Sequence, residues 1–139
     1  MRLAGILGGV LAACLMLSAC SGGQSAEDAR REVAAFHRHL DTGDHAAIWK
    51  NAALEVRASS TEQTFTRLLA RVHRQLGRVI ESKQVGWKTE STTSGSFTTL
   101  TMATRFARGA GQEEFVFRQT DKGLKLAGYH ISSQALKAD

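Results

Sequence analysis

The hydrophobic pattern of the chain changes its period once, near Leu76-Gly77, and this change limits the folds open to it. Before this point apolar residues recur every three or four positions, as on one face of a helix. After it they alternate with polar residues, as in half-buried strands. A helical half followed by a strand-forming half predicts an α+β domain, with helices packed on one face of an antiparallel sheet.

Two helices are predicted in the first part of the helical half. The first runs from about Glu27 to Leu40, and Gly43 is predicted to end it because glycine adopts a positive φ without steric penalty. Asp44 is predicted to cap a short second helix. The apolar residues of these two helices are Ala29, Val33, Phe36, Leu40, Ala47, Ile48 and Trp49.

A third helix is predicted between Ser59 and Gly77. Ser59 and Glu62 have the spacing of a capping box, in which the two side chains bond reciprocally to backbone N–H groups. Gly77 is predicted to end the helix. Its apolar face is formed by Phe65, Leu68, Leu69, Val72 and Leu76. We expect Phe36, Leu69 and Phe106 to share one core.

Four strands joined by short turns are predicted after Gly77, which favours an antiparallel meander that curves around the three helices. Turns are predicted at Gly95, at Gly109 with Gly111, and at Asp121-Lys122-Gly123. The predicted strands are Ile80 to about Lys88, Phe97 to Arg108, Glu113 to Thr120, and Leu124 to Ser132.

The N-terminus has the features of a secretion signal. Arg2 is followed by an apolar run over residues 3–17. As a helix this run would be about 22 Å long, shorter than the roughly 30 Å hydrocarbon core of a bilayer. The run ends in Leu17-Ser18-Ala19-Cys20, which resembles the bacterial lipobox. The resemblance implies cleavage between Ala19 and Cys20, and acyl chains such as palmitate on Cys20.

The alternative at this position is an ordinary secreted protein, cut after Ala19 and left with a free thiol at Cys20. If the source is Gram-negative, Ser21 after the cysteine favours the outer membrane over the inner one. The chain then divides into a signal peptide (1–19), a lipidated cysteine with a flexible tether (20–25), a folded domain (26–133) and a C-terminal tail (134–139). Cys14 leaves with the signal, so no disulfide is expected.

Three stretches carry a resemblance to a family of small bacterial lipoproteins and exported proteins with a cystatin-like, or nuclear-transport-factor-two-like, cone fold. They are residues 41–49, with His45 where the family has an aromatic, Leu76-Gly77, and residues 124–131, with Leu124 where the family has tryptophan. The resemblance covers about Ala26 to Ser132. It implies a fold and no activity, because one fold hosts many functions.

Polar residues near residue 40 invite a metal or catalytic interpretation. Two histidines two positions apart on a helix point about 200° away from each other and cannot face one ion. We therefore expect that these residues bind no metal and that they form a polar helix end, a turn and a helix cap. Asp41 and Asp44 could form an acid–base pair, but turn and cap roles account for them. The polar residues of this segment are His37, His39, Asp41, Asp44 and His45.

Some cone-fold enzymes place acids with a tyrosine or histidine inside the cone. Tyr129 and His130 are adjacent on the last strand, so only one of them can point inward. Trp49 and Trp87 could line a ligand pocket, and core packing is the favoured interpretation for Trp49. The sequence contains no recognisable Ser-His-Asp or Cys-His pattern, and we expect neither enzymatic activity nor a cofactor.

Basic residues are moderately in excess, with 18 Lys and Arg against 13 Asp and Glu. This excess suits an anionic lipid or cell wall polymer better than nucleic acid. Four arginines at helical spacing form what we call the basic stripe: Arg67, Arg71, Arg74 and Arg78. It is either a solvated helix face or a contact surface for an anionic lipid, polymer or envelope protein.

The sequence thus predicts a lipid-anchored, extracytoplasmic binding or scaffolding module of the cell envelope, attached to the membrane through acyl chains on Cys20. The alternative is a small-ligand-binding or enzymatic cone with an open interior cavity. The interior of the cone distinguishes them, because an apolar-filled cone favours the first and a roomy cavity with converging polar groups favours the second.

Overall fold

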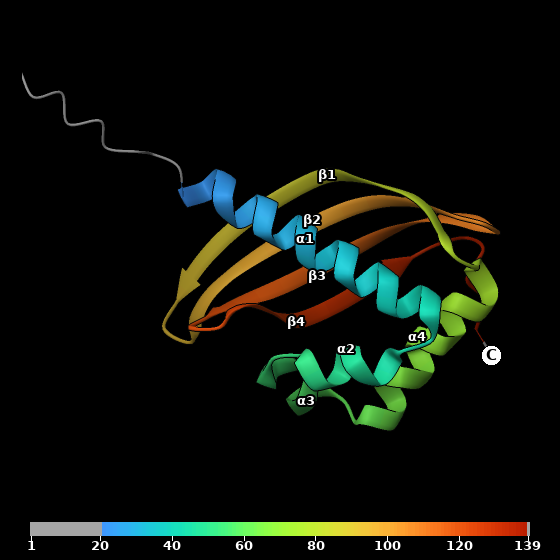
Figure 1. Ribbon diagram of the computed structural model, residues 1–139, viewed down its shortest axis with the longest axis horizontal. Coiled ribbons are helices and arrows are strands. Elements are labelled where there is room, and N and C mark those ends of the chain that lie inside the picture. The colour runs from blue at the N-terminus through green and yellow to red at the C-terminus, as the bar shows by residue number, and fades with distance from the viewer. Residues whose placement is uncertain (1–20, 139) are drawn as a thin grey trace, which may run out of the picture.

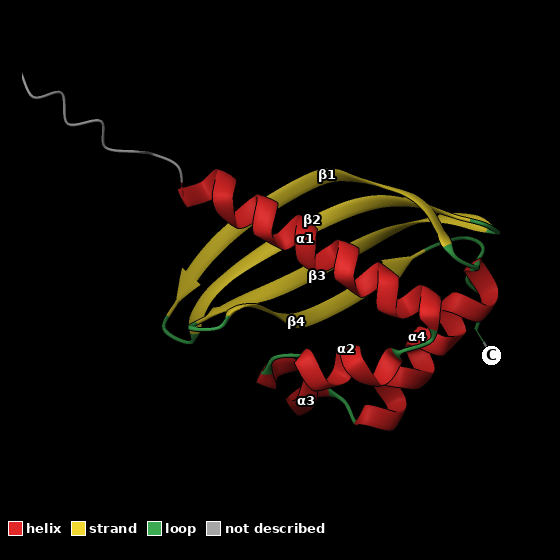
Figure 2. Cartoon of the chain, viewed as in Figure 1, coloured by secondary structure: helices red, strands yellow, loops and turns green. Residues whose placement is uncertain are grey.

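The computed structural model describes residues 21–138, and the predicted signal peptide and Cys20 lie outside them. Helices precede a four-stranded antiparallel sheet, which confirms the predicted α+β class (Figures 1 and 2). The described residues form four helices, not three, because a short helix follows the second one. The elements are α1 (Ser21–Thr42), α2 (His45–Asn51), α3 (Leu54–Ser59), α4 (Glu62–Leu76), β1 (Val79–Thr92), β2 (Gly95–Phe106), β3 (Gly109–Thr120) and β4 (Gly123–Ser132).

Helix α1 begins earlier than predicted and crosses the concave face of the sheet (Figure 1). Residues 21–25, predicted to be a flexible tether, are its first turns. Ala26 and Ala29 are both buried, so packing extends almost to the start of the helix. The predicted stop is confirmed, since Gly43 has a φ of 76°. Asp44 caps α2 as predicted, with its side chain accepting the N–H of Ala47.

Helix α4 starts from a different cap than the sequence predicted. Thr61, not Ser59, is the N-cap, and its hydroxyl accepts the N–H of Thr64 at 3.1 Å. Ser59 instead ends α3. At the other end Gly77 has a φ of 78° and closes the helix as predicted. The guanidinium of Arg108 donates to backbone carbonyls of the last turn, where the helix dipole favours a cation.

The sheet is a meander in the order β1-β2-β3-β4, so both β1 and β4 are edge strands. Register shifts interrupt the pairing at Val79/Glu81 and Gln84/Gly86 in β1, and at Val116/Phe117 between β3 and β4. Gly109, predicted in a turn with Gly111, lies in β3. A Cβ at Gly109 would lie 2.6 Å from the Cβ of Ala135, so the glycine permits close packing of the C-terminal segment.

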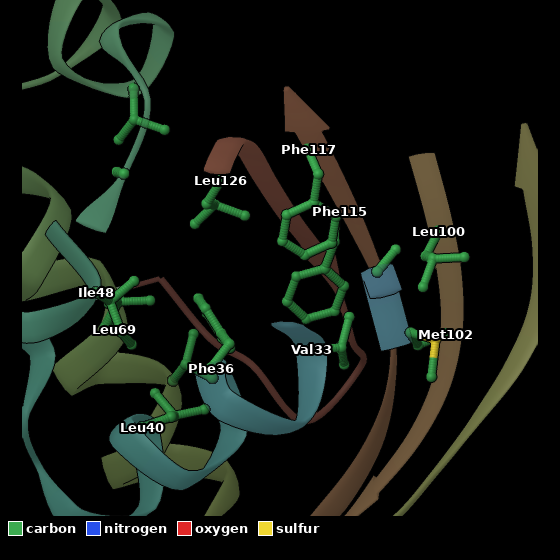
Figure 3. Packing of buried hydrophobic residues seen from close by; sticks show 14 of the residues in the cluster. Val33, Phe36, Leu40, Ile48, Leu69, Leu100, Met102, Phe115, Phe117 and Leu126 are labelled. Carbon is green, nitrogen blue, oxygen red and sulfur yellow. The ribbon is translucent and has the colours of Figure 1, made fainter. Parts of the chain in front are cut away.

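The core lies between α1 and the concave face of the sheet, with α2 and α4 closing it from the side (Figure 3). Phe36, Leu69 and Phe106 are 5%, 0% and 2% exposed and belong to one cluster, which confirms the predicted shared core. The segment after β4, predicted as a tail, packs on α4. Gln75 exchanges two hydrogen bonds with the backbone of Lys137.

Candidate functional site

A glutamate lies at the centre of the cone. Glu113 on β3 is fully buried, and three side chains from three other elements converge on its carboxyl group. His37 of α1 places Nε2 2.9 Å from Oε1. Thr104 of β2 donates its hydroxyl to the same oxygen at 2.6 Å. Tyr129 of β4 donates its hydroxyl to Oε2 at 2.7 Å. We call these four residues the Glu113 cluster.

Aromatic rings enclose one side of the Glu113 cluster. The ring of Phe36 packs on Phe115 in a T-shaped arrangement at 5.0 Å between centroids and on Tyr129 at 4.7 Å. Burial raises the pKa of the Tyr129 hydroxyl well above its usual value, and the adjacent Glu113 raises it further. The hydroxyl therefore stays protonated, as a donor to the glutamate, throughout the physiological range.

The carboxyl group of Glu113 finds its hydrogen-bond partners within the Glu113 cluster. Both carboxyl oxygens of Glu113 accept hydrogen bonds, and the hydroxyl of Thr104 also lies 2.8 Å from that of Ser82 on β1. The network thus links α1 to all four strands. A buried carboxyl group with these partners holds elements together, and a substrate would have to displace one of them to reach it.

Several cavities border the packed core. One of about 280 Å³ opens between α1, α2 and the β3–β4 turn, with Phe36, Ile48 and Phe117 among its lining residues. Another of about 250 Å³ lies between α3, α4 and β4, beside the ring of Tyr129 and the hydroxyl residues Ser59, Ser60 and Thr64. Both are smaller than the usual small-molecule pocket, which starts at about 300 Å³. A third cavity, of about 410 Å³, lies along β2, β3 and residues 132–134, and Thr104 is among its lining residues.

The polar residues predicted near the end of α1 separate in the structure. His37 faces Glu113, while His39 lies 3.5 Å from the Asp44 cap. Asp41 accepts the backbone N–H of Val79 at 3.2 Å and ties the end of α1 to the start of β1. Within residues 21–138 no three His, Cys, Asp or Glu side chains are grouped as metal ligands. These residues connect elements of the fold, as expected for Asp44.

The aromatic candidates take different positions. Trp49 is partly buried against the core and packs on Phe65, with ring centroids 5.8 Å apart. Trp87 on β1 is 45% exposed. Of the adjacent pair on β4, Tyr129 points into the cone and His130 is exposed.

The basic stripe is shorter than the sequence predicted. Arg67, Arg71 and Arg74 lie on α4, but the helix ends at Leu76, so Arg78 lies beyond it. Arg67 and Arg74 are exposed, and Arg71 is half-buried. Figure 1 shows α4 beside the C-terminal end of α1, away from the start of that helix.

Glu113 is the residue of this site that sequence reasoning missed. Its signal was present, because Glu113, Phe115 and Phe117 alternate along one strand and therefore share a face. A carboxyl group on the apolar face of a strand needs buried partners. The alternating pattern predicts the strand. The presence of Glu113 on its inner face further indicates a buried polar cluster.

The chain resembles a protein family in sequence and a solved structure in fold. The model of a family described as "Protein of unknown function (DUF4019)" matches residues 32–129. None of the curated proteins compared with the chain matches it. A solved structure from Streptomyces avermitilis, described as a "putative dehydratase from the NTF2-like family", is 16% identical, with a TM-score of 0.53. The match covers 81% of this chain and 98% of that one.

The structural likeness shows the fold alone, a nuclear-transport-factor-two-like cone, which confirms the predicted fold. No helix within residues 21–138 is both long and apolar enough to cross a membrane. The family match spans well over half of the chain and includes the residues from the middle of α1 to Tyr129. The chain therefore belongs to the DUF4019 family of proteins of unknown function.

Proposed function

We propose that this protein is an exported lipoprotein whose cone-fold domain acts as a binding or scaffolding module in the cell envelope. In this proposal residues 1–19 are a signal peptide removed before Cys20, and Cys20 carries the acyl chains. Ser21 after the cysteine favours the outer membrane, with the domain facing the periplasm, if the source is Gram-negative. Two or more buried chains give a stable anchor.

The filled interior of the cone is the observation that carries the binding role. The space beneath α1 is occupied by packed rings, and the polar groups that reach it are bonded to one another. A domain with a packed interior binds its partners through its outer surface. Binding through that surface accounts for a buried carboxyl group that is already bonded to its own neighbours, and for arginines grouped on the outside of α4.

The basic stripe is the surface that we propose for an anionic partner. Its three helical arginines keep their charge at any physiological pH. It lies at the end of the domain remote from residue 21, since Asp41 in the last turn of α1 is 3.8 Å from His73 on α4. A helix of 22 residues is about 33 Å long, several times the Debye length of about 8 Å. An anionic cell wall polymer fits this position better than the anchoring bilayer.

Co-sedimentation with isolated cell wall fragments tests the stripe. The mature chain should sediment with the fragments at low salt and less at high salt. Changing Arg67, Arg71 and Arg74 together to glutamine should remove most of this binding. A matched triple variant, with Arg31, Arg57 and Arg105 changed to glutamine, alters the net charge equally on other surfaces and should keep most of it. Equal binding by the wild type and the stripe variant, or none by either, would reject the stripe as a binding surface.

An acid–base enzyme is the second candidate, favoured by the convergence of His37, Glu113 and Tyr129 inside the cone. The solved structure of similar fold is described as a putative dehydratase. We rank this function second because substrate access to Glu113 requires an existing hydrogen bond to open. A small molecule whose nuclear magnetic resonance titration shifts signals around Tyr129 and Thr64, in the cavity beside the Glu113 cluster, would raise it above the first.

A further inference from the structure

Strand β1 carries most of the large apolar side chains that the described part of the chain exposes. Ile80 is 41% exposed, Val85 60% and Trp87 45%. Single exposed apolar residues are ordinary on protein surfaces. Here Val85 and Trp87 lie close together on an edge strand, although the register shift at Gln84/Gly86 breaks the alternation of faces between them. Trp87 is opposite Leu100, a core residue, and so lies on the helix-facing side of the sheet, where it is only partly covered.

The start of α1 lies beside this part of β1. The guanidinium of Arg30 donates to the side chain of Gln84 at 2.7 Å. One turn earlier, Ser25 lines the same cavity as residues 89–91 of β1. Trp87 is therefore level with about residue 27 of α1, which is some 9 Å along the helix from Ser21. Figure 1 shows α1 crossing β1 in this region.

The charges around Val85 and Trp87 are largely paired. Lys88 lies 3.4 Å from Glu90, and Arg31 pairs with both Glu27 and Asp28. This surface is close to neutral and thus differs from the basic stripe. Long-range attraction to anionic groups is not expected of it. Its distinguishing group is an exposed indole, an apolar ring with one N–H donor, which favours the boundary between lipid headgroups and acyl chains.

We infer that the first turns of α1 together with Trp87, which we call the anchor end, lie on the surface of a lipid bilayer, with the indole of Trp87 in its headgroup interface. The inference rests on the proposed acylation of Cys20. That residue directly precedes Ser21, where α1 begins, so no flexible spacer separates the acyl chains from the helix. The bilayer then lies within about 10 Å of Trp87, and the basic stripe projects away from it.

The other candidate occupant is a second copy of the chain, paired edge to edge through β1. Two features oppose it. The register shift at Gln84/Gly86 interrupts the strand where Val85 lies, and bulges of this kind disfavour edge pairing. Lys83 and Lys88 flank the same segment, and lysines on an edge strand have the same effect.

Tryptophan fluorescence on vesicles tests the inference. The chain has two tryptophans, and Cys20 is the one cysteine left once residues 1–19 are removed. The mature chain is coupled through Cys20 to phosphatidylcholine vesicles that contain a maleimide lipid. The Trp49→Phe variant leaves Trp87 as the reporter, and the Trp87→Phe variant leaves Trp49 as the matched control. If Trp49→Phe lowers stability, the difference between the wild type and Trp87→Phe gives the same information.

Replacing the lipid by its brominated form should quench most of the Trp87 emission, because bromine quenches only on contact. Emission from Trp49 should stay unchanged. The inference would be overturned if, in the coupled chain, brominated lipid leaves the Trp87 emission unchanged while iodide dissolved in the water still quenches it. If Trp87 is already protected from iodide without vesicles, and the chain elutes as a dimer on size-exclusion chromatography, the surface is assigned to a second copy of the chain. Coupling is chemical, so failure of Cys20 acylation in cells is a separate result.

Discussion

His37 and Glu113, 76 positions apart in the sequence, meet inside the cone with 2.9 Å between Nε2 and Oε1. The contact joins the middle of α1 to the inner strand β3, where the side chain of Glu113 has no access to water. Their partners Thr104 and Tyr129 extend the link to β2 and β4. One carboxyl group thus fixes the position of the long helix on the sheet.

Replacing Glu113 should therefore lower stability strongly. Glu113→Ala leaves three side chains inside the cone without the carboxyl group that they share, and we expect the free energy of unfolding to fall by about 3–5 kcal/mol. Glu113→Gln keeps the shape but turns one acceptor into a donor, so a loss of about 1–3 kcal/mol is expected. Urea unfolding measures both. The adjacent, exposed Glu114→Gln is the matched control, with a change within about 0.5 kcal/mol. Similar shifts for Glu113→Gln and Glu114→Gln would contradict this role.

Tyr129 predicts a loss of stability at high pH. The folded state holds the phenolic proton more tightly than the unfolded chain, because burial and Glu113 raise the pKa of the hydroxyl. The free energy of unfolding should be unaffected below about pH 10 and should fall as the pH rises above it. Tyr129 is the sole tyrosine, so tyrosinate absorbance reports on it alone.

In a pH titration, that absorbance should rise later in the folded protein than in urea. The Tyr129→Phe variant should lose less stability than the wild type between pH 9 and the alkaline end of the titration. Coincident titration curves for folded and unfolded protein would show that the hydroxyl is not held by Glu113.

The shared core predicts large effects at three distant sequence positions. Phe36→Ala, Leu69→Ala and Phe106→Ala each leave a cavity in the cluster that joins α1, α4 and β2. We expect each to lower the free energy of unfolding by about 2–5 kcal/mol. Thermal melts of the mature chain measure this loss. Melting temperatures close to wild type in all three variants would mean that these side chains do not form one core.

Much of the fold could be predicted from the sequence, because its elements follow regular periods. The first and last helices and all four strands were expected from spacing alone. Helix α3 is six residues long, too short to show a helical period. The inward residue of β4 could not be predicted either. Leu124, Leu126 and Tyr129 all face the core, which strict alternation forbids.

The register shift at Val116/Phe117 explains this orientation. Phe117 pairs with Leu126 and Val116 with Gly128, so Ala127 is an extra residue that reverses the alternation. Tyr129 then points into the cone and His130 away from it. A bulge depends on the neighbouring strand as well as on its own sequence, and therefore a single strand does not reveal it. The Glu113 cluster was hidden for the same reason, since its four members come from four elements.

The cap of α4 is a case in which two candidates compete locally. Ser59 and Thr61 are both N-cap residues by type, and the structure selects Thr61. Thr61→Ala should lower the free energy of unfolding by about 0.5–2 kcal/mol, because it removes the acceptor of the Thr64 N–H. Ser59→Ala should have a smaller effect, since the Ser59 hydroxyl bonds only to the carbonyl of Val56 in the preceding turn. Urea unfolding of the two variants side by side decides, and a larger effect at Ser59 would favour the capping box.

Acylation of Cys20 is the central claim, and radiolabelled palmitate tests it directly. In a bacterial host the wild type should take up label and fractionate with membranes. Cys14→Ser, the matched control, removes the cysteine in the predicted signal and should behave as the wild type does. Cys20→Ser should lose both the label and the membrane attachment. A wild type that takes up no label, together with a Cys20→Ser variant that remains membrane-bound, would contradict the account.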